Sequence, residues 1–135
     1  YALINREFQD APDWLRARMG LSQDTSALHL QCMHYSGNKS FQYEDRWINL
    51  AAVPKAADQD FKIIGPNEWL IKEVPFSDAE ITFSAINANA KISELLRISV
   101  DTALVALERS TWLNSIPITY TKLYFHTGYQ MTSRL

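Results

Sequence analysis

The chain of 135 residues has the length of one domain, and 47% of its residues are hydrophobic while 21% are charged. A net charge of −2 and a pI of about 5.9 argue against a nucleic-acid-binding surface, which is usually basic. No apolar segment is long enough to span a membrane, and the first residues lack the layout of a signal peptide. We expect one cytoplasmic, globular domain that is a piece of a longer protein.

The first ten residues show no clear hydrophobic period, and we expect them to be the end of a linker. A short helix is predicted from Ala11 to Met19, because Asp10 can cap its start and Gly20 can end it. The domain proper is therefore expected to cover residues 11–135.

Alternating polar and apolar residues predict a β-hairpin after this helix. The two strands are expected at residues 27–35 and 40–49, with a turn at Ser36-Gly37-Asn38-Lys39. A short helix is predicted at residues 54–57.

The second half of the chain predicts two more helices among several strands. Asn67 is a suitable cap for a helix over residues 68–73, and Asn89 can start a helix that runs to Arg97. Strands are predicted at residues 80–87, 102–111, 116–125 and 129–135. Because most connections are short enough for hairpins, the fold class is α+β, a mostly antiparallel sheet of about six strands flanked by helices.

Common catalytic and metal-binding motifs do not occur in the chain. The sequence contains no P-loop, dinucleotide fingerprint, nucleophile elbow or CxxC pair. The only cysteine, Cys32, could act as a nucleophile beside His34, but a small core residue is the favoured interpretation. We therefore expect no catalytic residues, no metal site and no cofactor.

The segment Phe41–Asn49 carries the most informative polar residues. Glu44 and Arg46 share one face of the predicted strand, where alternate residues lie about 7 Å apart. They could form a solvated surface pair, or they could line a polar wall and hold opposite ends of a small ligand. The pattern of residues alone does not decide between these alternatives.

Four segments of the chain resemble one family of regulators. They are FQYEDRWINLAAVP from Phe41 to Pro54, GPNEWLIKEVPFSDAEITFSA from Gly65 to Ala85, ALERSTW from Ala106 to Trp112 and PITYTKLYF from Pro117 to Phe125. They are similar to the ligand-sensing UTRA domain of the HutC branch of the GntR transcription-factor family, which represses histidine-utilisation genes.

This resemblance implies a fold like that of chorismate lyase, a homodimer, and a winged helix-turn-helix domain that would precede residues 1–10. DNA would be bound only through that missing domain. The resemblance also implies that urocanate, or a close metabolite of histidine breakdown, is the effector that weakens operator binding. The chain is accordingly expected not to be an enzyme.

The resemblance also suggests which residues form the effector site. Arg46 is the candidate for the ligand carboxylate and Glu44 for an imidazole N–H, because their groups match in charge and hydrogen bonding. Trp69 is expected to cover the flat ligand, and the helix that starts at Asn67 is the candidate lid. The further hydrogen-bonding candidates are His34, Asn67, Ser84 and Thr119.

Two rival functions remain from the sequence. The domain could be a dimerisation module without a ligand, or a small aromatic-acid enzyme on the chorismate-lyase fold. The lack of a convincing nucleophile or acid–base pair argues against the enzyme.

Overall fold

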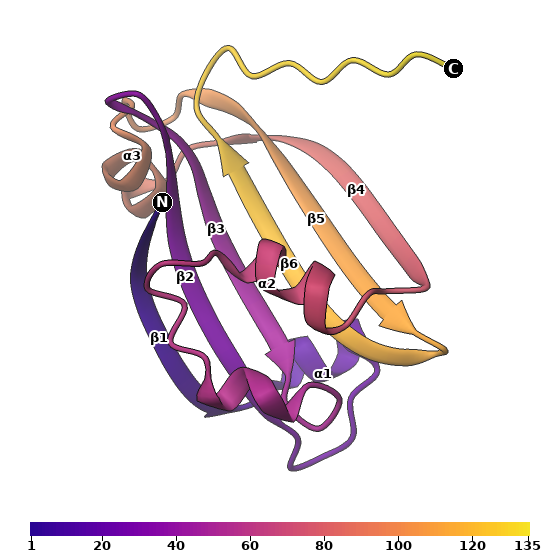
Figure 1. Ribbon diagram of the computed structural model, residues 1–135. Coiled ribbons are helices and arrows are strands. Elements are labelled where there is room, and N and C mark those ends of the chain that lie inside the picture. Colours follow the sequence, from indigo (N-terminus) through magenta and orange to yellow (C-terminus); the bar gives the residue numbers. More distant parts are fainter.

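The computed structural model describes all 135 residues as one antiparallel sheet with helices on both faces (Figure 1). The strand order is β1-β2-β3-β6-β5-β4, and every neighbouring pair is antiparallel. The strands are β1 (Ala2–Asp10), β2 (Ser26–Ser36), β3 (Lys39–Asn49), β4 (Asp78–Asn87), β5 (Ala103–Leu113) and β6 (Ile116–Phe125). The helices are α1 (Asp13–Met19), the 3-10 helix η1 (Pro54–Asp58), α2 (Pro66–Glu73) and α3 (Ala90–Leu96). The expected α+β class and the expected number of strands are confirmed.

The six strands are not the six that the sequence pattern indicated. Residues 2–10, which were expected in a linker, form the edge strand β1 and pair with β2. An irregularity between Leu3 and Asn5 shifts the register, and this shift obscures the alternation on which a strand prediction depends.

The strand predicted at residues 129–135 is absent. The chain becomes irregular after Phe125 and runs past the ends of β5 and β4 (Figure 1), with the ring of Tyr129 stacked on that of Phe125. Gly128 has a φ of 84°, and both sides of β6 are already paired with β3 and β5. The tail therefore has no strand edge of β6 to join.

Helix starts differ in how they are capped. The side chain of Asn89 accepts a hydrogen bond of 2.9 Å from the backbone N–H of Ile92, which confirms it as the cap of α3. Asp10 caps nothing, because α1 begins after Pro12. Asn67 lies inside α2, whose N-terminal residue Pro66 follows Gly65, so its side chain is free for another contact. None of these helices is long and apolar enough to cross a membrane.

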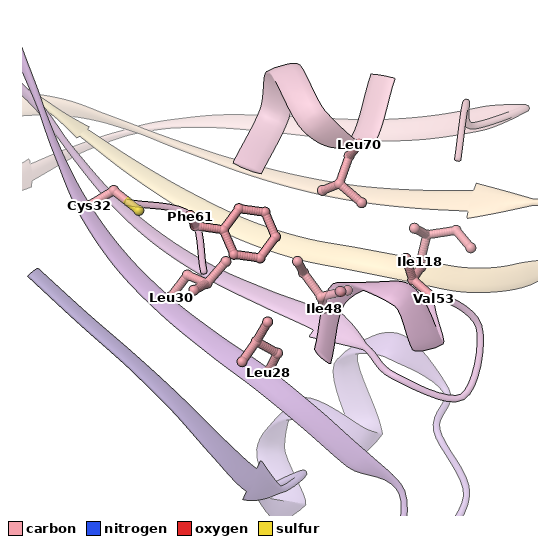
Figure 2. Packing of buried hydrophobic residues seen from close by; sticks show 9 residues of the cluster. Leu28, Leu30, Cys32, Ile48, Val53, Phe61, Leu70 and Ile118 are labelled. Atoms are coloured by element: carbon pink, nitrogen blue, oxygen red, sulfur yellow. The ribbon is translucent and has the colours of Figure 1, made fainter. Parts of the chain in front are cut away.

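The largest core cluster lies on the face of the sheet that η1 and α2 cover, here called the α2 face. Figure 2 shows the side chains of this cluster between the strands and the segment that contains α2. Leu28 and Leu30 of β2 and Ile48 of β3 point up from the sheet, and Leu70 of α2 points down onto them. Two smaller clusters bury the opposite face beneath α1 and α3.

Strand β1 holds the segment that leads into α2. The Arg6 guanidinium donates hydrogen bonds to the carbonyl of Gln59 over 3.0 Å and to that of Ala57 over 2.7 Å. The hydroxyl of Tyr1 donates to the carbonyl of Phe61 over 2.7 Å. Tyr1 and Arg6 thus fix residues 57–61 to the N-terminal end of the chain by three side-chain hydrogen bonds.

Candidate functional site

Three polar side chains form a chain of hydrogen bonds on the α2 face. Nε of Arg46 donates to Oε2 of Glu44 over 2.6 Å, and Nε2 of His34 lies 2.7 Å from Oε1 of the same carboxylate. The side chains of Glu44 and Arg46 are each only 3% exposed. Glu44 therefore links the other two residues and is shielded from solvent.

The charge of Glu44 is fixed by its neighbours. Burial alone would raise the pKa of this carboxyl group, but the Arg46 guanidinium and the hydrogen bonds from His34 and Arg46 lower it to about 2. Glu44 is accordingly ionised at neutral pH and balances the charge of Arg46.

This burial excludes one of the two interpretations of the sequence pattern. Glu44 and Arg46 are not a solvated surface pair, because they bind one another inside the protein. The guanidinium reaches back along β3 to the carboxylate two positions earlier, which the spacing of alternate strand residues permits.

A hollow of about 300 Å³ lies between α2 and the sheet beside this pair. It is partly open, and its inner part has room for little more than one water molecule. The residues that line it are Arg46, Asn67, Leu70, Ile71, Val74, Phe76, Arg109, Thr111, Ile118 and Thr119. In this form the hollow is too small for a ligand, although its wall combines apolar side chains with a few polar groups, as ligand sites usually do.

A second arginine, Arg109 of β5, faces the same hollow. One of its terminal nitrogens donates to Oδ1 of Asn67 in α2 over 2.9 Å, and its Nε is buried without a hydrogen-bond partner. Burial, together with the nearby Arg46, lowers the pKa of Arg109. Sequence reasoning missed this residue, although the quoted segment ALERSTW places Arg109 and Thr111 two positions apart on one strand face.

The structure brings together five of the seven candidate site residues. Arg46, Asn67 and Thr119 line the hollow. Glu44 is joined to it through its hydrogen bond with Arg46, and His34 is joined in turn through its hydrogen bond with Glu44. The Thr119 hydroxyl lies 2.7 Å from that of Thr111, which lines the hollow as well.

The other two candidates lie elsewhere. Trp69 packs against the core, with its ring edge-on to Phe61 at a centroid distance of 5.5 Å, so it does not cover the hollow. Ser84 of β4 is the register partner of Ala106, and this row continues across the sheet through Tyr124 to Tyr43. Tyr43 is next to Glu44 on β3 and so points to the opposite face, and Ser84 therefore belongs to that face as well. The structure does not bring these two residues to the other five.

Cys32 is a buried core residue. Its thiol has no exposed surface, its pKa is raised to about 12 chiefly by burial, and its sulfur lies 3.5 Å from the hydroxyl of Tyr1. A thiol in this setting is a poor nucleophile. No group of three His, Cys, Asp or Glu side chains is placed to hold a metal ion.

A second hollow lies on the opposite face, beside α1. It is lined by Trp14, His29, Asp45, Trp47, Tyr120, Lys122 and Tyr124. The rings of His29 and Trp47 stack at 3.9 Å, and Nε2 of His29 lies 2.8 Å from Asp45. His29 and Asp45 are thus paired with each other, whereas Lys122 forms no ion pair. This hollow therefore offers a single cationic side chain, where the hollow beneath α2 has two arginines.

Comparison with known proteins places this geometry in a family. Residues 1–129 match the family model described as the UTRA domain. The chain is 27% identical over 107 residues to the histidine utilization repressor of Klebsiella aerogenes, covering 79% of this chain and 44% of that protein. It is 30% identical over 100 residues to the histidine utilization repressor of Pseudomonas aeruginosa, covering 74% of this chain and 40% of that protein. The chain thus spans less than half the length of these relatives, and both are named as repressors rather than as enzymes.

A solved structure shows the same fold. The crystal structure of the C-terminal domain of the histidine utilization repressor from Pseudomonas syringae pv. tomato superposes with a TM-score of 0.91 at 22% identity. The superposition covers 98% of this chain and 95% of that domain. With the family model matched over almost the whole chain, the chain belongs to the UTRA domain family.

Proposed function

We propose that this chain is the effector-binding and dimerisation domain of a transcriptional repressor of histidine-utilisation genes. Urocanate, or a close metabolite of histidine breakdown, is the proposed effector. The names of the matched relatives support the regulatory role. The match covers less than half of each relative, and we expect a DNA-binding domain in the part that is not matched. A repressor of this kind acts on DNA, so we expect the whole protein in the cytoplasm.

The observation that carries the proposal is the set of charges at the hollow beneath α2. Arg46 and Arg109 contribute two positive charges, whereas Glu44 is the only carboxylate paired with either of them. Buried charge without a counterion is costly, so this site favours a small anion. Urocanate matches these groups, with a carboxylate for a guanidinium and an imidazole for the His34–Glu44 pair.

The proposed signal is a movement of α2. Because the inner hollow has little free room, a ligand must displace this helix to enter. The helix follows the segment that Arg6 and Tyr1 bind, so a shift of α2 would reach β1, before which the DNA-binding domain is expected. Two arrangements with different affinity for the ligand are the minimum that such regulation requires.

An exposed apolar surface on β4 supports dimerisation. Ile81 and Phe83 are 51% and 52% exposed on the edge strand of the sheet, where a second copy could cover them. This surface would also serve a dimerisation module without a ligand, so only a binding experiment separates that alternative from the sensor.

The test is a thermal-shift panel of histidine-pathway metabolites, followed by calorimetric titration of the compound that stabilises most. A ligand at 100 times its dissociation constant adds about 2.7 kcal/mol to the free energy of unfolding. Arg46→Lys keeps a positive charge beside Glu44 but loses the planar fork, so we expect its affinity for urocanate to fall about tenfold or more. Arg18→Lys, on the opposite face, is the matched control. A panel without any stabilising metabolite would contradict the sensor function.

A further inference from the structure

We propose that Arg109 is the principal anion-binding residue of the hollow, and that the carboxylate of the ligand replaces the side chain of Asn67 on its guanidinium. This inference rests on the proposed function for the identity of the ligand, and it adds how binding is coupled to α2. It differs from the expectation that Arg46 alone binds the carboxylate and that Asn67 contacts the ligand.

The charges of the two arginines at the hollow are compensated unequally. Arg46 is compensated by Glu44 at 2.6 Å, whereas Arg109 forms no ion pair with any carboxylate. Its one side-chain partner is the neutral amide of Asn67. An anion therefore gains more from Arg109, where it finds an uncompensated charge, than from Arg46, where it meets the repulsion of Glu44.

Two buried polar atoms near the hollow have no hydrogen-bond partner. Arg46 of β3, Thr121 of β6 and Arg109 of β5 form one row across the sheet, because each is the register partner of the next. The hydroxyl of Thr121, which is fully buried, and Nε of Arg109 both lack a hydrogen-bond partner. Such groups are nearly always satisfied in native proteins. The free Nε of Arg109, together with the free hydroxyl of Thr121 between the two arginines, therefore indicates a missing acceptor, either on a ligand or on a water molecule that accompanies it.

Asn67 forms the only side-chain hydrogen bond between α2 and this row of residues. The bond from Arg109 to its Oδ1 spans 2.9 Å and joins the helix to the middle of the sheet. A carboxylate accepts a stronger hydrogen bond from a guanidinium than a neutral amide does. Binding of the anion at Arg109 would therefore release Asn67, and with it the first turn of α2.

The test is a calorimetric titration of the 135-residue chain with urocanate and with its neutral amide. Arg109→Gln is expected to lower the affinity for urocanate about 10- to 100-fold while changing the affinity for the amide little. Asn67→Ala is expected to raise the affinity for urocanate about threefold or more, because it removes the competing acceptor. Arg18→Gln and Asn38→Ala, at exposed positions, are the matched controls. A lower affinity in Asn67→Ala would show that Asn67 contacts the ligand. It would overturn the proposal that the ligand carboxylate replaces Asn67 on Arg109.

A second measurement tests the hydrogen bond between Arg109 and Asn67 without any ligand. Both Arg109→Gln and Asn67→Ala remove the same hydrogen bond, so the amides of Leu70 and Ile71 should exchange hydrogen faster in both variants, and by a similar factor. Unchanged exchange in both variants would overturn the coupling to α2.

The outcomes also separate this inference from the proposed function. Equal urocanate affinity in the wild type and in Arg109→Gln overturns the inference and leaves the function standing. If the wild type binds benzoate but no histidine-pathway metabolite, and Arg109→Gln loses that binding, the assigned effector is overturned and the inference stands. If the wild type binds none of these carboxylates, both are overturned.

Discussion

Glu44 and Arg46 form an ion pair of 2.6 Å within one strand, with both side chains shielded from solvent. Removing either partner leaves the other as a buried, uncompensated charge. This pair therefore stabilises the fold and also belongs to the candidate site.

We expect Glu44→Gln to lower the free energy of unfolding by about 3–5 kcal/mol, since it leaves the Arg46 guanidinium without its counterion. Urea denaturation followed by circular dichroism measures the change. Glu80→Gln, at an exposed position of β4, should alter the free energy by no more than about 0.5 kcal/mol. Equal effects of the two substitutions would contradict the structural role of the pair.

The low pKa of Glu44 predicts a particular response to acid. The carboxyl has a pKa of about 2 in the folded protein against an ordinary value of 4.5, so the folded state holds its proton less tightly than the unfolded state. The resulting stabilisation, up to about 3 kcal/mol, is complete above pH 4.5 and is lost as the pH falls towards 2. The difference in melting temperature between wild type and Glu44→Gln should shrink over this interval. A difference that is constant with pH would be inconsistent with this assignment.

Phe61 is fully buried in the core cluster under η1 and α2, although its φ of 60° is unusual for a bulky residue. We expect Phe61→Ala to cost about 3–5 kcal/mol in unfolding free energy, because it opens a cavity beneath the helix that covers the hollow. The control is Phe8→Ala, at a ring that is more than half exposed, and its expected cost is much smaller. A loss of less than about 1 kcal/mol for Phe61→Ala would mean that this core tolerates the cavity by collapsing.

The Asn89 cap of α3 contributes measurably to the free energy of unfolding. Asn89→Ala removes the acceptor for the backbone N–H of Ile92 and should lower the free energy of unfolding by about 1 kcal/mol. Asn38→Ala in the exposed turn between β2 and β3 is expected to change it much less. A similar small effect of both substitutions would contradict the capping role.

Most of the fold could be predicted because its elements carry local signals. The β2–β3 hairpin shows alternation around a turn with Gly37, and Asn89 marks the start of α3. Strand β1 was missed because the irregularity near Leu3 breaks the alternation, and the tail after Gly128 was wrongly predicted as a strand because its composition says nothing of whether a strand edge is free.

The candidate site could be predicted only where its residues are neighbours in sequence. Glu44 and Arg46 are two positions apart on one strand, so their common face follows from local geometry. Arg109 is brought beside Arg46 only by the strand order β3-β6-β5, which no local pattern specifies. For the same reason the face of Ser84 could not be assigned, since it depends on the register between β4 and β5.

The most direct test of the central claim is an NMR titration that follows the side-chain Nε–H signals of the arginines while urocanate is added. If the hollow beneath α2 is the effector site, the signals of Arg46 and Arg109 and the backbone amides of α2 should shift together and saturate at one ligand per chain. Saturable shifts confined to the indole signals of Trp14 and Trp47, on the opposite face, would contradict the account, as would a spectrum that urocanate leaves unchanged.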